Sequence, residues 1–225
     1  ILQRILCVFG IAGNVLNLRT LQSASLQTVP FMYIRALAVF DLIGLLGVLV
    51  YTLSEYVPEA YLKYVYKAHV EFVLINTFFI GGLNCAFLLT VERYLLISRP
   101  HYRQSNPKRV ARRRIALAWS LAFATHVPLA VQMQPRLHGA GRYTVANNVA
   151  LICRAPWFTI FTYYKFLREC IRFSCVIAMT TLNLVIARRL QITKRKRREM
   201  CLRSAASSAA SIATVAQPSA RSSLA

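Results

Sequence analysis

The chain alternates between long apolar stretches and shorter polar ones, and the apolar stretches carry very little charge. Uncharged apolar runs of about 18 residues or more are typical of helices that cross a membrane. The pattern therefore predicts an all-α membrane protein. Its five predicted helices cover residues 2–18, 31–53, 64–98, 111–133 and 159–190.

These helices make up a predicted transmembrane region at residues 1–200. Residues 201–225 are rich in Ser and Ala and show no core-forming pattern. A segment that cannot bury apolar surface does not recover the entropy cost of folding. We therefore expect 201–225 to be a disordered, low-complexity C-terminal tail.

The composition agrees with a multi-pass membrane protein, since 56% of the 225 residues are hydrophobic and only 16% are charged. The net charge of +21 would suggest nucleic acid as a partner for a soluble protein. Here, however, the basic residues cluster after the first, third and fifth predicted helices. Loops rich in Lys and Arg stay in the cytosol and meet the negative lipid surface. We therefore expect the N-terminus outside, the lipid bilayer as a partner, and no nucleic acid.

Asp41 is the acidic residue in the middle of an apolar run. A carboxylate at the bilayer centre costs about 2.5–3.5 kcal/mol on insertion scales, so it must face a polar interior. It could form an ion or proton site, or a polar hub that links helices, with Asn14 as a partner. The alternative interpretation is a buried, hydrogen-bonded carboxylate with a structural role.

Other charged residues lie near predicted helix ends. Glu92 and Arg93 are adjacent and can form a charge-assisted pair, although a solvated helix end would show the same residues. Arg168 and Arg172 are four residues apart and share a helix face. This face could be an interfacial basic surface or an outward-opening pocket for a polar or anionic group, and both interpretations stay open.

The sequence shows no catalytic constellation and no metal-like spacing of His and Cys, so we expect neither enzymatic activity nor a cofactor. Five motifs in order nevertheless resemble the rhodopsin-like (class A) G-protein-coupled receptors. They are "GNVLN", "LAVFD", "ERY" with Pro100 after it, Trp119 with Pro128, and "MTTLNLVIARRL". The last resembles invertebrate neuropeptide receptors, including the FMRFamide-receptor-like group.

The resemblance implies a plasma-membrane receptor that transmits binding of an extracellular neuropeptide to a heterotrimeric G protein. It makes Arg93 the activation switch, Glu92 its restraint and Tyr94 a supporting residue, followed by Pro100. Ligand-pocket candidates follow by position. They are Tyr51, Glu55, Glu71, Ile75, Asn76, Phe79, Arg168 and Arg172.

Several departures narrow this expectation. Ile75 stands where amine receptors carry an Asp. We therefore do not expect the kind of amine ligand that those receptors bind. Asp41 corresponds to the family's sodium-binding acid, but the position that supplies a hydroxyl to that ion is Gly82, so we do not expect sodium. The family's common disulfide is not expected either. Ala68 occupies one of its positions and leaves Cys153 as an odd thiol.

The resemblance implies seven helices and the pattern predicts five, so the expectation is a seven-transmembrane bundle truncated to helices 1–5. A chain of five helices is expected not to signal by itself. Two alternatives stay open: a polytopic transporter or channel subunit, and a non-signalling truncated receptor that associates with full receptors. A receptor dimer is a further partner that the sequence leaves open.

Overall fold

A computed structural model of the chain describes residues 1–98 and 106–215, without the side chains of 140 and 203–215. It divides into two units, Ile1–Thr180 and Thr181–Ala225. All of the sites considered below lie in the first unit. Pro100, a predicted site residue, lies outside the described residues.

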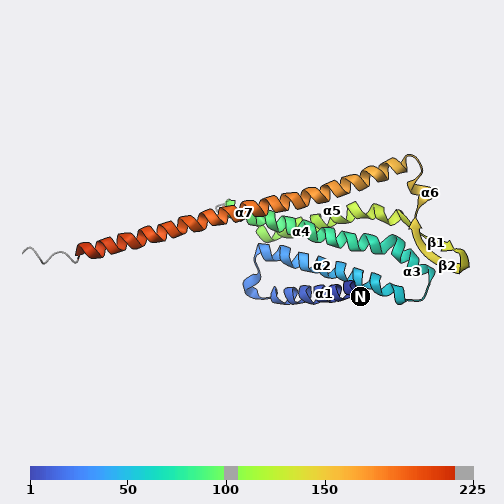
Figure 1. Ribbon diagram of the computed structural model, residues 1–225, viewed down its shortest axis with the longest axis horizontal. Coiled ribbons are helices and arrows are strands. Elements are labelled where there is room, and N and C mark those ends of the chain that lie inside the picture. The colour runs from blue at the N-terminus through green and yellow to red at the C-terminus, as the bar shows by residue number, and fades with distance from the viewer. Residues whose placement is uncertain (99–105, 216–225) are drawn as a thin grey trace, which may run out of the picture. The chain divides into compact units, whose positions relative to one another are not determined.

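The first unit is built mainly from helices that pack in chain order (Figure 1). A π-helical turn, Lys67–Glu71, joins α3 to α4 without a break. The helices of this unit are α1 (Leu2–Thr20), α2 (Val29–Leu53), α3 (Tyr61–Tyr66), α4 (Phe72–Ser98), α5 (Pro107–His126), α6 (Val149–Ile152) and the first part of α7 (Trp157–Val215).

Four helical segments within the described residues are long and apolar enough to cross a membrane. They are Val29–Tyr56, Tyr61–Ser98, Pro107–Val131 and Trp157–Leu202. At most 28% of each apolar window is buried inside the chain, so most of this surface faces outward, as it does on lipid-facing helices. The chain is a mostly helical, multi-pass membrane protein.

The first predicted helix, residues 2–18, is a helix in the structure but is not among these four candidate membrane spans. The apolar run of α1 is diluted by charged residues near both ends, Arg4 and Arg19, and by Asn14 and Asn17. The α5 helix also ends earlier than expected, at His126, and continues as a 3₁₀ turn over Val127–Val131. Pro128 explains this because it has no N–H for the α-helical ladder.

Close packing of α2 against α4 depends on small residues and on rings. A Cβ added to Gly47 would come within 2.9 Å of Ile75, so glycine is required for this approach. Phe40 and Phe78 lie with their ring centroids 5.9 Å apart, and Phe78 continues to Trp119 of α5 at 6.3 Å. These rings join the three central helices of the unit.

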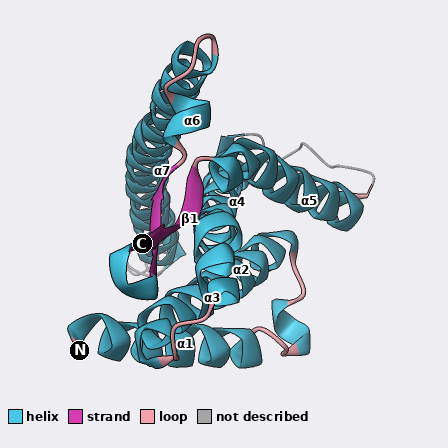
Figure 2. Ribbon diagram, turned by 90° about the vertical axis from the view of Figure 1, so that its right-hand side faces the viewer, coloured by secondary structure: helices cyan, strands magenta, loops and turns pink. Residues whose placement is uncertain are grey.

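The segment between the predicted helices 111–133 and 159–190 contains an antiparallel hairpin (Figure 2). Strand β1 (Met133–His138) pairs with β2 (Arg142–Asn147), from Met133 opposite Asn147 to His138 opposite Arg142. Gly141 has a φ of 75° in the connecting turn, a left-handed conformation that favours glycine. The hydrophobic pattern did not predict these two strands.

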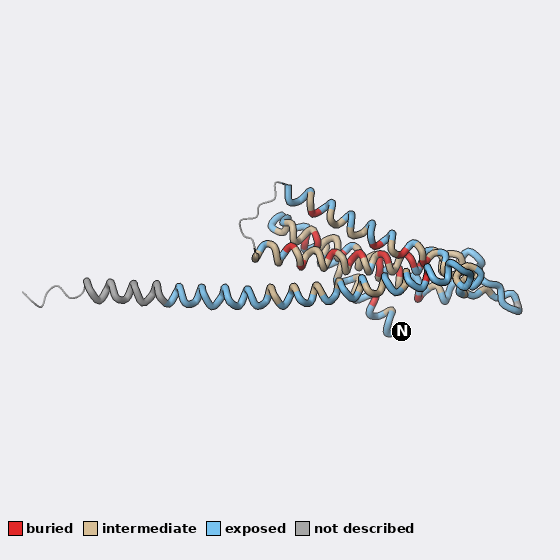
Figure 3. Tube along the Cα trace, turned by 90° about the horizontal axis from the view of Figure 1, so that it is seen from above, coloured by how far each residue is buried: buried red, intermediate tan, exposed pale blue. Residues whose placement is uncertain are grey.

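The second unit also differs from the expectation. The backbone of α7 is helical through Val215, so residues 201–215 are not the unfolded segment that their composition predicted. Ala has the highest intrinsic helix propensity, and a helix can continue without a packed core. Residues 181–202 are exposed or half-buried, whereas the buried positions lie in the first unit (Figure 3).

Candidate functional site

A cavity of about 850 Å³ opens beside the hairpin. Residues from α1, α2, α3, the π-helical turn, α4 and both strands line it. Its wall combines four aromatic rings with two acidic and two basic side chains. These are Tyr51, Tyr64, Phe72 and Tyr143, together with Glu59, Glu71, Lys67 and Arg142.

The hairpin forms one wall of this cavity through Tyr143 of β2. The Tyr143 ring lies 5.4 Å from that of Tyr61 and 5.9 Å from that of Tyr64, measured between centroids. A two-stranded hairpin is marginally stable alone, so these contacts hold it against α3. The sequence analysis did not predict the hairpin residues. The signal that could have indicated a hairpin is the glycine pair Gly139 and Gly141, followed by the strand-like segment "RYTV".

Four predicted ligand-pocket residues line this cavity: Tyr51, Glu71, Ile75 and Asn76. The Asn76 amide also donates a hydrogen bond of 2.7 Å to the carbonyl oxygen of Phe72 on its own helix.

Two other predicted pocket residues, Glu55 and Phe79, do not line this cavity, and their part in ligand binding stays a prediction. Glu55 forms an ion pair of 3.5 Å with Arg4, which also donates a 2.6 Å hydrogen bond to the Tyr56 hydroxyl. The Phe79 ring instead packs on α2, where a Cβ added to Gly44 would meet it at 3.3 Å.

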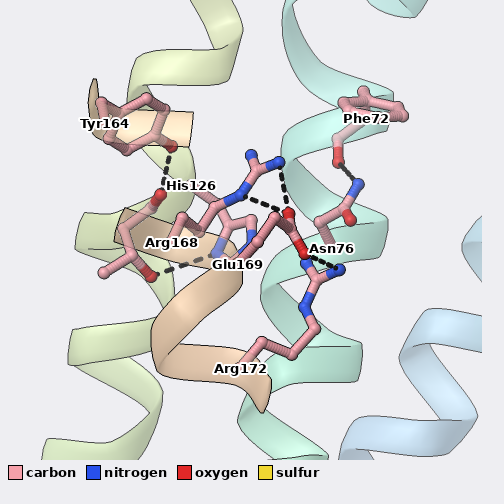
Figure 4. Close-up of polar contacts among 8 residues, drawn as sticks. Phe72, Asn76, His126, Tyr164, Arg168, Glu169 and Arg172 are labelled. Carbon is pink, nitrogen blue, oxygen red and sulfur yellow. Dashed lines mark hydrogen bonds and ion pairs between the residues drawn. The ribbon is translucent and has the colours of Figure 1, made fainter. Parts of the chain in front are cut away.

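The remaining candidates, Arg168 and Arg172, form a separate polar cluster (Figure 4). Glu169 lies between them and accepts from both, at 2.9 Å from Arg168 and 2.9 Å from Arg172. The Tyr164 hydroxyl donates to the Thr125 carbonyl and so ties this part of α7 to α5. Part of the basic face is therefore neutralised within the chain.

His126 belongs to the same cluster and is 1% exposed. Its Nδ1 lies 2.7 Å from the Ala122 carbonyl oxygen, which can only accept, so Nδ1 carries the proton. In the neutral imidazole, Nε2 then presents a lone pair. Within the described residues Nε2 has no partner, and neither do Nη1 of Arg168 and Nε of Arg172. The space beside these atoms is about 40 Å³, which is room for a water molecule.

The "ERY" segment lies near the other end of α4, where the expected pairing is wrong. Glu92 is 9% exposed and accepts a hydrogen bond of 3.0 Å from Nη1 of Arg114 on α5. Arg93 is exposed and forms no ion pair within residues 1–98 and 106–215. Neighbours in a helix point about 100° apart, so Glu92 faces α5 while Arg93 faces outward.

Arg114 also interacts electrostatically with Tyr33, a buried residue of α2. The three side chains connect α2, α4 and α5 at this end of the unit. Tyr94 is half-buried and follows Arg93 on α4.

Asp41 faces α4, where its carboxylate lies too close to Gly82 to leave room for a side chain at that position. A Cβ added to Gly82 would come within 2.9 Å of Asp41 Oδ1. The Asn14 amide, its predicted partner, donates instead to the Gly10 carbonyl on its own helix at 2.9 Å. The expected Asn14–Asp41 hydrogen bond is therefore absent from the described part of the chain, and Asp41 packs against backbone rather than against a hydroxyl.

Comparison with known proteins identifies relatives of this chain. Residues 13–218 match the sequence model of the rhodopsin family of 7 transmembrane receptors. A probable G-protein coupled receptor of Caenorhabditis elegans is 36% identical over 208 residues, which cover 87% of this chain and 46% of that protein. A second probable G-protein coupled receptor of the same organism is 25% identical over 205 residues, which cover 85% of this chain and 48% of that protein. The chain spans about half the length of these curated relatives.

Proposed function

Because this chain belongs to the rhodopsin family of seven-transmembrane receptors, we propose that it is the ligand-sensing part of a G-protein-coupled receptor for a peptide. The observation that carries this proposal is the cavity of about 850 Å³ beside the hairpin. Ligand sites are typically about 300–1,000 Å³. A wall with aromatic rings and both signs of charge suits a peptide, whose side chains and termini offer the same mixture.

The proposed orientation places the cavity and the hairpin outside the cell. The ends of α1 and α4 away from the cavity, at Thr20 and Ser98, lead into the loops after the first and third predicted helices. In the sequence these loops hold more basic residues than the loops after the second and fourth predicted helices. Such residues are retained on the cytosolic side. In this arrangement Glu92, Arg93 and Tyr94 lie inside, and the N-terminus lies outside.

One helix connects the two ends. The α4 helix supplies Phe72 and Asn76 to the cavity and carries Arg93 near its other end. A helix rises about 1.5 Å per residue, so the stretch from Phe72 to Arg93 covers about 30 Å, close to the hydrocarbon thickness of a bilayer. A ligand that binds more tightly to one position of α4 would shift the equilibrium between the positions of this helix. The same shift would move the end of α4 that carries Arg93, on the G-protein side.

Within this proposal Arg93 is the residue that contacts the G protein, because it is exposed and its charge is not paired within the described part of the chain. Glu92 stays with Arg114 and holds α4 to α5. Restraint of the switch is therefore a contact between helices rather than between neighbours in sequence.

The test expresses the full-length product that contains this chain in cells with a G-protein dissociation reporter. A synthetic peptide library supplies the ligands. We expect a subset of peptides to give a response that is lost in Arg93→Ala and kept in Arg113→Ala, a matched change at an exposed arginine of α5. Peptide-gated ion flux without G-protein dissociation would contradict the proposal and favour the transporter or channel alternative.

A further inference from the structure

Glu71 has an unusual environment for an acidic side chain. It is 3% exposed, and its Oε1 is enclosed without a hydrogen-bond partner among the described residues. A buried carboxylate normally binds a partner, because an unpaired charge in a medium of low dielectric constant is costly. Glu71 therefore lacks the group that would compensate its burial.

Two basic residues share the π-helical turn with Glu71, but neither fills this role: His69 contacts the Ala130 carbonyl oxygen at 2.5 Å, and Lys67 points to a tyrosine. Its ammonium lies over the Tyr51 ring, 5.3 Å from the centroid. It influences Glu71 electrostatically but does not approach within ion-pair distance of it in the described structure. The four-residue separation would favour a pair on a regular helix. Here the π-helical turn Lys67–Glu71 separates the two residues instead.

The missing partner can come from the cavity, because Glu71 is part of its wall. The rings of Tyr51, Tyr64 and Tyr143 line the same cavity. Aromatic faces attract cations, and a carboxylate beside them adds a full opposite charge. Single π-helical turns inside α-helices are also frequent at functional sites.

We propose that Glu71 is the counter-ion for a cationic group of the ligand, a guanidinium or an ammonium. This inference rests on the receptor function proposed above, and it names the chemistry that the cavity selects. The cation binds Glu71 at the base of the site while the tyrosines cover its flat or apolar surface. A basic side chain or the free N-terminus of a peptide would supply such a group.

The test uses this chain in lipid nanodiscs and two matched pairs of small probes, measured by their retention on the immobilised protein. Phenylguanidinium is compared with the neutral phenylurea, and benzylammonium with benzyl alcohol. We expect each cation to bind roughly tenfold more tightly than its neutral counterpart. The better of the two cations identifies a guanidinium or an amine as the ligand group.

Glu71→Gln keeps the size of the side chain and removes its charge, and Glu55→Gln is the control at an exposed glutamate that does not line the cavity. The preference for cations should disappear in Glu71→Gln and remain in Glu55→Gln. Equal binding of cation and neutral probe by the unmodified chain overturns the proposal, as does an equal loss in both variants. Because no G protein is present, either result leaves the receptor proposal to its own test.

A thermal unfolding measurement separates this role from a structural one. Removing an unpaired buried charge should leave the empty Glu71→Gln chain at least as stable as the original. A clear drop in its midpoint temperature would show that Glu71 holds the fold, and would contradict its role as a free counter-ion.

Discussion

Glu92 binds Arg114 across two helices at 3.0 Å, while Arg93, its neighbour in sequence, remains exposed. Adjacent ionised residues suggest an intrahelical pair, but helix geometry points them in different directions. The ion pair fastens α4 to α5 and leaves the arginine charge directed outward. Any motion of α4 away from α5 must therefore break this contact.

The Arg114→Gln change should destabilise the chain by about 1–3 kcal/mol, because it leaves the nearly buried Glu92 carboxylate unpaired. The estimate is below that for a fully buried pair since the Arg114 side chain is 35% exposed. Thermal unfolding in detergent micelles measures the change. Arg113→Gln, at an exposed position, should have little effect, and Glu92→Gln added to Arg114→Gln should recover part of the loss. No recovery in the double variant would count against the pair.

Gly82→Ala and Gly13→Ala should shift stability in opposite directions. At Gly82 the new methyl group would lie 2.9 Å from Asp41 Oδ1 and 3.3 Å from Leu37 Cδ1, which predicts a loss of about 1–3 kcal/mol. At Gly13 nothing lies within 4 Å, so the helix gains about 0.5–1 kcal/mol from the better helix former. Unfolding midpoints of both variants provide the measurement, and equal shifts would contradict the packing described for α2 and α4.

Tyr143→Ala should release the hairpin from α3, because it removes both ring contacts at once. The loss is about 1–2 kcal/mol of local stability. Hydrogen exchange measured on residues 133–147 should become faster, with little change in α2. Leu137→Ala, at a residue 64% exposed in β1, is the control and should leave the exchange rates unchanged.

Glu169→Gln should destabilise this part of α7 by less than about 1 kcal/mol, because both ion pairs lie within one helix and the Glu169 side chain is 38% exposed. Its carboxylate neutralises Arg168 and Arg172, one on each oxygen, and the variant loses the negative charge and one of the two acceptor oxygens. Unfolding in nanodiscs and the rate of proteolysis within residues 157–180 report the change. The further change Arg172→Met should restore part of the stability, whereas an additive loss would show that the two arginines act independently of Glu169.

The helices of the transmembrane region could be predicted because long apolar runs need no tertiary information. The run around Asp41 and the run before Glu92 each became one helix, α2 and α4. Tyr51, Glu71, Ile75 and Asn76 were placed by resemblance alone, and they line one cavity because α2 faces the π-helical turn and the start of α4 there.

The errors arose where a contact depends on residues far apart in the chain. Glu55 is held by Arg4 of α1, and no local pattern around Glu55 indicates this partner. The hairpin is stabilised by Tyr61 and Tyr64, so its own sequence carries only a weak signal. The pairing of Glu92 depends on the packing of α4 on α5, which periodicity does not determine.

The π-helical turn Lys67–Glu71 offsets the rotational phase of α3 from that of α4. Each residue of a helix advances it by about 100°, so deleting one residue from the turn would rotate α3 by about that angle relative to α4. Tyr61 and Tyr64 would turn away from Tyr143 while the rest of the span kept its register. The length of this short segment, as much as its side chains, therefore sets which face of the helix the hairpin meets.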